Sequence, residues 1–139
     1  TKHATAHHAV LSVDLVHDDI PYVIANTHFP VTVEGQADDF QRTAAPKLLE
    51  ITKALGECVL VGDFNAPRGG EIFSLLASKL KDNIPATIST SIDGSLHRAG
   101  ALPYMVDSIF STPRYAVTDV VQHVGISDHT AFSALIRCT

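Results

Sequence analysis

The spacing of apolar residues changes several times along this chain, and each change predicts an element. Residues 9–16 and 22–29 alternate, imperfectly, between apolar and polar side chains, and turn-forming residues occupy 17–21. This pattern is typical of two β-strands joined as a hairpin. From Asp38 the apolar residues recur at steps of three and four, which predicts one amphipathic helix. The residues of that stripe are Phe40, Ala44, Leu48, Ile51 and Leu55.

Two residues bear on the limits of this helix. Pro46 lies inside the stripe and is expected to kink the helix or to mark where its regular part begins. Gly56 is expected to end it. The apolar run at residues 58–61 then predicts a strand that is buried on both faces, and residues 71–80 repeat the helical spacing. Strand, helix and strand in this order favour an α/β-layered arrangement.

The remaining part of the chain is richer in polar residues. Residues 82–85 should break the second helix, and residues 86–102 form a long polar connection of a kind that is often functional in compact domains. Further strands are expected at residues 104–110, 117–121 and 131–136.

Composition narrows the class of protein. A chain of 139 residues suits one domain, so residues 1–139 are taken as a single unit. A net charge of −5 disfavours non-specific binding to long nucleic acid.

We expect no membrane span, because no apolar run approaches the ~18 residues that a span needs. No signal peptide is visible, which points to a cytoplasmic location. Cys58 and Cys138 provide no disulfide framework.

The first residues contain a short histidine tract of His3, His7 and His8. Such a tract can bind metal. A polar start to the first strand is the favoured interpretation, because no other candidate ligand lies nearby in the sequence.

Polar side chains also accompany four predicted strands. His28, Asp63 and Asn65 lie where two strands end, Asp107 interrupts the apolar run of the strand at 104–110, and Asp128 and His129 stand just before the last strand. Each alone has a structural explanation, such as turn chemistry or a histidine whose hydrogen bonds are satisfied locally. Because ligand sites in open sheets collect at strand ends, we expect these side chains to converge.

The chemistry of this set suits phosphate ester hydrolysis. Asp63 and Asn65, two residues apart at a strand end, face the same way. Carboxylate oxygens suit Mg²⁺ or a polarised water, and the amide can bind a phosphate or a metal. Hydrolysis needs a polarised phosphoryl group, a positioned water and a proton donor near the leaving oxygen. No Ser or Cys lies in a nucleophile motif such as G-x-S-x-G, so a covalent enzyme is disfavoured.

Four short motifs carry a family resemblance. They are Asn26-Thr27-His28, Gly62-Asp63-Phe64-Asn65, Val106-Asp107-Ser108-Ile109 and Ser127-Asp128-His129. In this order and approximate spacing, the sequence resembles the endonuclease/exonuclease/phosphatase family, the metal-dependent superfamily that includes DNase I. The match covers roughly residues 9–137.

The resemblance implies an α+β fold, a DNase I-like β-sandwich flanked by helices. A complete domain of this family has four layers, α/β/β/α, and its first half carries a metal-binding Glu. Glu34, Glu50, Glu57 and Glu71 do not lie in that motif's context. We therefore expect this chain to correspond to the C-terminal half of such a domain.

The resemblance also implies a role for each motif residue. Asp63 would orient or deprotonate the attacking water, and Asn65 would hold the phosphate or the metal. His129, oriented by Asp107, would contact the scissile phosphate. Asp128 would bind the metal together with Asp63 and Asn65.

Other residues are expected around this centre. His28 would lie near the leaving group, and Asn26 would support the site. His97 and Arg98, in the polar connection, could contact phosphate, although a solvated loop explains them equally well. The implied cofactor is Mg²⁺, with Mn²⁺ as the second candidate.

The sequence thus predicts metal-dependent hydrolysis of a phosphate ester by an activated water, as a phosphodiesterase or nuclease or as a phosphatase. It leaves open whether the substrate is a nucleic acid, a phospholipid or a sugar phosphate. The alternative is a catalytically silent family member, or a half-domain that acts as an interaction module. A lone half would expose an apolar sheet face, so self-association or pairing with an N-terminal half is expected.

Overall fold

The computed structural model describes residues 8–139, so His3 and His7 of the histidine tract lie outside the described residues. The described chain forms seven strands, two α-helices and a short 3-10 helix. These elements are β1 (Val10–His17), β2 (Ile20–His28), η2 (Val33–Gly35), α1 (Asp39–Leu55), β3 (Val59–Asp63), α2 (Glu71–Ala77), β4 (Lys81–Asp82), β5 (Asp107–Ser111), β6 (Tyr115–His123) and β7 (Ala131–Cys138).

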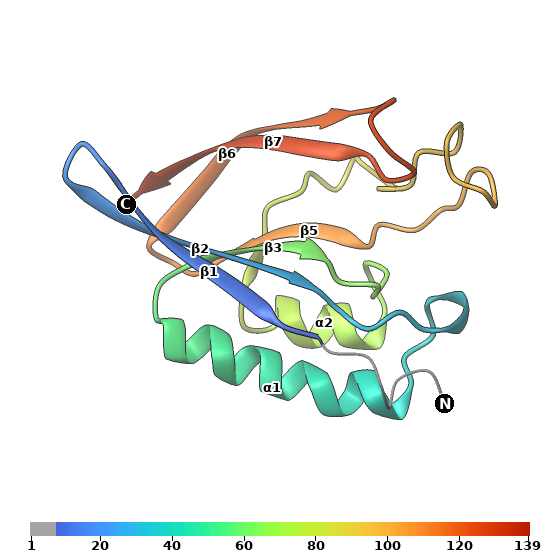
Figure 1. Cartoon of the computed structure of the whole chain (residues 1–139), viewed down its shortest axis with the longest axis horizontal. Coiled ribbons are helices and arrows are strands. Elements are labelled where there is room, and N and C mark those ends of the chain that lie inside the picture. Colours follow the sequence, from blue (N-terminus) through green and yellow to red (C-terminus); the bar gives the residue numbers. More distant parts are fainter. Residues whose placement is uncertain (1–7) are drawn as a thin grey trace.

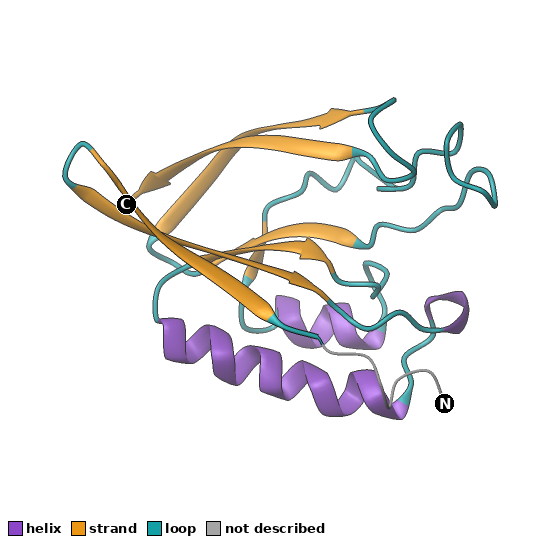
Figure 2. Ribbon diagram, viewed as in Figure 1, coloured by secondary structure: helices purple, strands orange, loops and turns teal. Residues whose placement is uncertain are grey.

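The strands form two sheets, one of five strands in the order β1-β2-β3-β5-β4 and one of the pair β6-β7. Both α-helices cover one face of the larger sheet, and β6 and β7 lie over its other face (Figure 1). The secondary-structure colouring shows the three layers as helix, sheet and sheet (Figure 2). The layered α+β arrangement that the sequence predicts is therefore present.

Strand β3 has a hydrophobic cluster on each side, as expected of a buried strand. Leu60 packs towards the helices in a cluster with Leu76 and Phe110. Val59, its neighbour in sequence, packs between the two sheets with Tyr115. The face of the larger sheet towards β6-β7 is called here the sandwich face.

Part of the sandwich face is open to solvent at β1. Leu11, Val13 and Leu15 are 70%, 44% and 51% exposed. In the antiparallel register they pair with residues of β2 that include Ile24, a member of the cluster between the sheets. Side chains of paired residues share a face, so these three belong to the sandwich face. The expected exposed apolar surface is present.

Helix α1 corrects one detail of the predicted apolar stripe. Phe40 and Ile51 are 37% and 44% exposed, so they do not lie in the buried face of the helix. The buried residues of α1 are Gln41, Ala45, Leu48 and Thr52. Two of these are polar and satisfy their hydrogen bonds within the protein, which a pattern based on hydrophobicity does not register.

Several element boundaries also differ from the predicted ones. Helix α1 begins at Asp39, well before Pro46, and ends at Gly56 as expected. Helix α2 stops at Ala77, while Leu80 remains buried beyond it. Strand β5 begins at Asp107, because the preceding Met105 and Val106 carbonyls accept hydrogen bonds from loop N–H groups.

Gly62 allows β2 and β3 to lie close together. Its φ is +144°, and an added Cβ would lie 1.9 Å from the Thr27 carbonyl oxygen. Thr27 is its register partner on β2. Only glycine fits at this position, directly before Asp63.

None of the helices in the described part of the chain is long and apolar enough to cross a membrane. The predicted cytoplasmic location stays a prediction.

Candidate functional site

Three predicted site residues form one row across the larger sheet. His28 is the last residue of β2 and pairs in register with Asp63, the last residue of β3. Asp63 in turn pairs with Asp107, the first residue of the antiparallel strand β5. Asp63 and Asp107 lie two residues along their strands from the sandwich-face residues Val61 and Ile109, so their side chains face the second sheet as well.

His129 meets this row from the other sheet. It lies just before β7, and its Nδ1 is 2.7 Å from Asp107 Oδ2. Since a carboxylate only accepts, the ring nitrogen donates. The predicted hydrogen bond between these residues is present. One ligand atom each from Asp63, Asp107 and His129 can be chosen so that all lie within 4.8 Å of one another.

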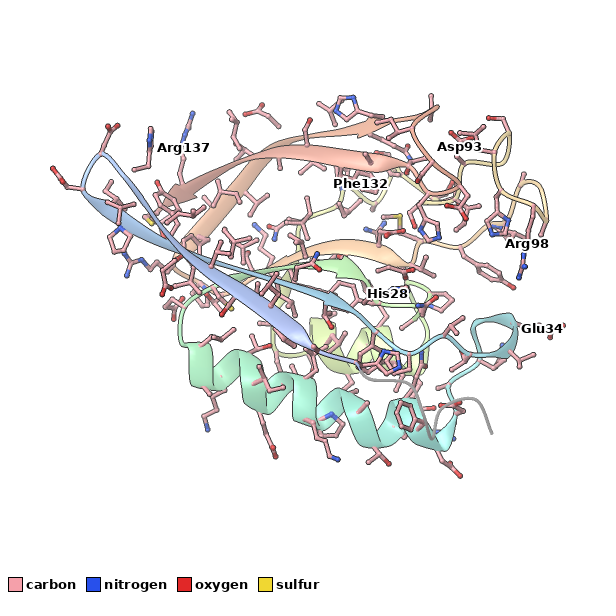
Figure 3. All side chains as sticks on the ribbon, viewed as in Figure 1. His28, Glu34, Asp93, Arg98, Phe132 and Arg137 are labelled. Carbon is pink, nitrogen blue, oxygen red and sulfur yellow. The ribbon has the colours of Figure 1, made fainter. Side chains whose placement is uncertain are left out.

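His28 stands at the open side of the row. Its Nε2 lies 3.5 Å from Asp63 Oδ2, and its side chain is 76% exposed. Figure 3 shows His28 on the same side of the molecule as Arg98, which lies farther out. The row is therefore open to solvent at His28 and partly buried at Asp63, whose side chain is 20% exposed.

The environment shifts the pKa values of two of these groups. Burial raises the pKa of Asp63, against the opposing effect of the Asn65 N–H that the carboxylate accepts. Burial alone would lower the pKa of His129. The hydrogen bond and charge of Asp107, with further contributions from Asp63 and Asp128, outweigh burial and raise it. The site thus favours the protonated form of the His129 imidazole, and burial makes the Asp63 carboxyl group costly to ionise.

Two hydrogen bonds fix Asn65, one from its backbone N–H and one from its side-chain amide. It has a positive φ of 46°. Its N–H donates to Asp63 Oδ1 at 2.8 Å, and its Nδ2 donates to the Phe29 carbonyl at 2.8 Å. This bond uses one of the two Nδ2 hydrogens and orients the amide, so the carbonyl oxygen Oδ1 is available to a ligand.

Gln41 of α1 binds the backbone of the same region through its side chain. It is 1% exposed, and its Nε2 donates to the carbonyls of Pro30 at 2.7 Å and of Asn65 at 3.1 Å. One buried amide therefore ties together the segments that follow His28 and Asp63. Sequence reasoning missed Gln41, because polarity on a helix usually marks the solvent side.

The other predicted site residues lie around this centre. Asp128 is exposed beside His129 and is outside the group of three ligand atoms. Asn26 is exposed on β2, two residues before His28. His97 and Arg98 occupy the polar connection; His97 Nδ1 accepts the Ala99 N–H at 3.2 Å. The roles assigned to these four residues stay predictions.

The donors present fit a hard divalent cation in type. Asp63 and Asp128 provide carboxylate oxygens, and Asn65 provides an amide oxygen, which are ligands that Mg²⁺ accepts. Two glutamates are engaged elsewhere: Glu71 pairs with Arg42, and Glu57 accepts the Arg114 N–H.

No family model and no curated protein sequence matches the chain. Among solved structures, an endonuclease/exonuclease/phosphatase from Beutenbergia cavernae matches with a TM-score of 0.72 and 18% identity, over 94% of this chain and 39% of its own. The human Nocturnin catalytic domain with bound sulfate anion matches with a TM-score of 0.72 and 16% identity, over 96% of this chain and 54% of its own.

A third structure is a Bacteroides thetaiotaomicron mannosyl-6-phosphatase, with a TM-score of 0.65 and 17% identity, over 86% of this chain and 52% of its own. The chain thus spans about half the length of the structures it matches. At these identities the likeness is one of fold. The chain has the fold of about half of an endonuclease/exonuclease/phosphatase protein, in agreement with the resemblance in its sequence.

Proposed function

We propose that this chain carries the aspartate–histidine part of a site that hydrolyses phosphate esters with an activated water. The observation that supports this most is the convergence of Asp63, Asp107 and His129, which come from three separate segments, within 4.8 Å. The pairing of Asp107 with His129 at 2.7 Å gives that group a fixed orientation. The fold of the matched structures, which include a phosphatase by name, supports the same reaction class.

The histidine is suited to bind and stabilise the phosphoryl group. Asp107 takes Nδ1, so Nε2 is the nitrogen that can donate to a phosphoryl oxygen. The raised pKa of His129 favours the charged imidazole, which is the form that stabilises negative charge developing on that oxygen. Asp107 thereby sets both the tautomer and the charge of the ring.

Asp63 is suited to handle the proton of the attacking water. Burial raises the pKa of its carboxyl group, and this makes the ionised form a better base. As the water oxygen forms its bond to phosphorus, its proton passes to Asp63. The ester P–O bond breaks, and the leaving oxygen takes a proton from His28, whose Nε2 lies 3.5 Å from Asp63 Oδ2 and which regains a proton from solvent at its exposed side chain.

Mg²⁺ is the proposed cofactor, with Mn²⁺ as the second candidate, and its proposed ligands are Asp63, Asn65 and Asp128. When bound, the cation would polarise the phosphoryl group. His97 and Arg98 are proposed to contact further phosphate oxygens, and Asn26 to support His28. The substrate class stays open between nucleic acid, phospholipid and sugar phosphate. The net charge of −5 disfavours long nucleic acid held by charge alone.

The experiment is turnover of a chromogenic phosphodiester and a phosphomonoester, with Mg²⁺ and with a chelator. It is run on this chain and on the full-length product of the gene that encodes it. We expect the complete product to be active and the isolated chain to be weak or inactive. His129→Ala should lower kcat by about 10²–10³, the size of effect found when one charge-stabilising donor is removed. An equal rate for wild type and His129→Ala would contradict the proposal.

A second candidate is an interaction module without catalysis. It is favoured by the exposed Leu11, Val13 and Leu15 on the sandwich face, which provide apolar area for another protein surface. That partner would be a second copy or an N-terminal half of the fold. Activity that is absent from the complete product, together with stable association through this face, would favour the module.

A further inference from the structure

The Asp107–His129 pair joins two layers of the molecule. Asp107 begins β5 in the larger sheet, whereas His129 precedes β7 in the smaller one. A 2.7 Å contact between side chains of different layers needs a feature that fixes their backbones relative to each other. Residues 91–93, within the polar connection, form hydrogen bonds both to the backbone at the start of β5 and to the backbone around His129.

Ser91 is the residue of this segment that reaches the start of β5. It is fully buried. Its Oγ accepts the N–H groups of Val106 at 3.0 Å and of Asp107 at 3.1 Å. Its own N–H donates to the Tyr104 carbonyl at 3.0 Å. The side-chain oxygen of Ser91 thus takes the place that a neighbouring strand's carbonyl would take for these two N–H groups.

The same segment is tied to the loop that carries His129. The Ser91 carbonyl accepts the Thr130 N–H at 2.8 Å. Ile92 forms an antiparallel bridge with His129, and the Asp93 N–H donates to the Asp128 carbonyl at 2.9 Å. Backbone hydrogen bonds therefore run from residues 91–93 to Asp128 and Thr130, the two residues that flank His129.

We propose that Ser91 is a positioning residue that sets the Asp107 carboxylate against the His129 ring. It binds the backbone N–H of Asp107 through its side chain and the residue after His129 through its carbonyl. Removal of Oγ leaves the second connection intact and releases the first. Asp107 can then shift or rotate relative to His129, while the rest of the fold is retained.

The first test needs no catalysis. Proton NMR at low temperature detects the Nδ1–H of a histidine that donates to a carboxylate as a downfield signal, and Asp107→Asn identifies it by abolishing it. Ser91→Ala should shift this signal or speed its exchange with solvent at least about tenfold, a loss of roughly 1.4 kcal/mol of protection. A signal unchanged in position and exchange rate would overturn the proposal.

Ser108→Ala is the matched control. Ser108 is also a buried serine, lies next to Asp107 on β5, and donates from Oγ to Asp82 at 2.7 Å instead of contacting residues 91–93. It should leave the downfield signal in place. If Ser91→Ala does not fold, Ser91→Cys retains a side chain of similar shape with a poor acceptor, and the same loss of signal is expected.

The second test rests on the proposed function and uses the complete gene product. Ser91→Ala should lower kcat by about 10²-fold, as a small misplacement of a reacting group does, with KM changed by less than about twofold. In an Asp107→Asn background, Ser91→Ala should lower kcat no further, because both act through one pair. Equal effects in both backgrounds would contradict positioning through Asp107. An inactive wild type would refute the proposed function and leave the NMR test to decide on Ser91.

Discussion

Asp107→Asn tests the pair at the centre of the site through folding stability. The substitution retains the size of the side chain and one acceptor oxygen, but removes the negative charge that faces His129. The side chains of His129 and Asp107 are 27% and 21% exposed, so the pair is only partly screened by water. Hydrogen bonds to charged groups contribute about 1.5–3 kcal/mol and are roughly twice as strong as neutral ones. We therefore expect a loss of about 1–2 kcal/mol.

The pH dependence of this loss follows from the direction of the pKa shift. The pKa of His129 is raised in the folded state, so folding strengthens proton binding. The resulting stability is fully present below the unfolded pKa of about 6.5, and it disappears as the pH rises through the folded pKa. The difference between wild type and Asp107→Asn should accordingly be larger at about pH 5.5 than at about pH 9.

Urea unfolding at the two pH values, in the presence of a chelator, measures this difference. Asp128→Asn is the control, because it removes the same charge from an exposed residue beside His129. It should change stability by less than about 0.5 kcal/mol. An Asp107→Asn loss that is the same at both pH values, or no larger than that of the control, would refute the account of the pair.

Three further predictions concern the fold around the site. Gly62→Ala should lower the free energy of unfolding by more than about 3 kcal/mol or prevent folding, because its Cβ would meet the Thr27 carbonyl oxygen. The control Gly69→Ala, also at positive φ but without a close neighbour, should lower it by about 1–2 kcal/mol. Equal shifts in the thermal unfolding of the two variants would contradict the clash. Gln41→Ala should cost about 2–3 kcal/mol in urea unfolding, because two carbonyls lose their donor; a loss below about 0.5 kcal/mol would show that they do not depend on it. The isolated chain should self-associate in sedimentation velocity, and Leu11→Lys should weaken this association; a monomer at all concentrations would contradict it.

The strands, and the end of the sheet at which the site lies, could be predicted from the sequence because the patterns that indicate them are local. Alternation predicts the β1-β2 hairpin, and the apolar run before Gly62 predicts β3. Polar residues that end such strands must lie at a sheet edge, so the convergence of His28, Asp63 and Asp107 could be anticipated. The register that places these three in one row depends on strand pairing, which no local pattern specifies.

The supporting residues could not be predicted, because they contradict the usual relation between polarity and exposure. Gln41 and Ser91 are polar and almost fully buried, and their partners are backbone groups far away in the sequence. Phe40 and Ile51 show the opposite case: their spacing fits the helix stripe, but α1 turns Gln41 and Thr52 inward instead. Such choices depend on tertiary hydrogen bonds that periodicity does not contain.

The central claim is that the row at the strand ends is a cation-assisted site for phosphate esters. Titration of the isotope-labelled chain with Mg²⁺, followed by NMR in parallel for wild type and Asp63→Asn, tests it most directly. The account predicts saturable shifts at Asp63, Asn65 and Asp128 that Asp63→Asn abolishes, and a further response of His129 when inorganic phosphate is added. Shifts confined to other acidic residues, or identical titrations of the two proteins, would contradict it.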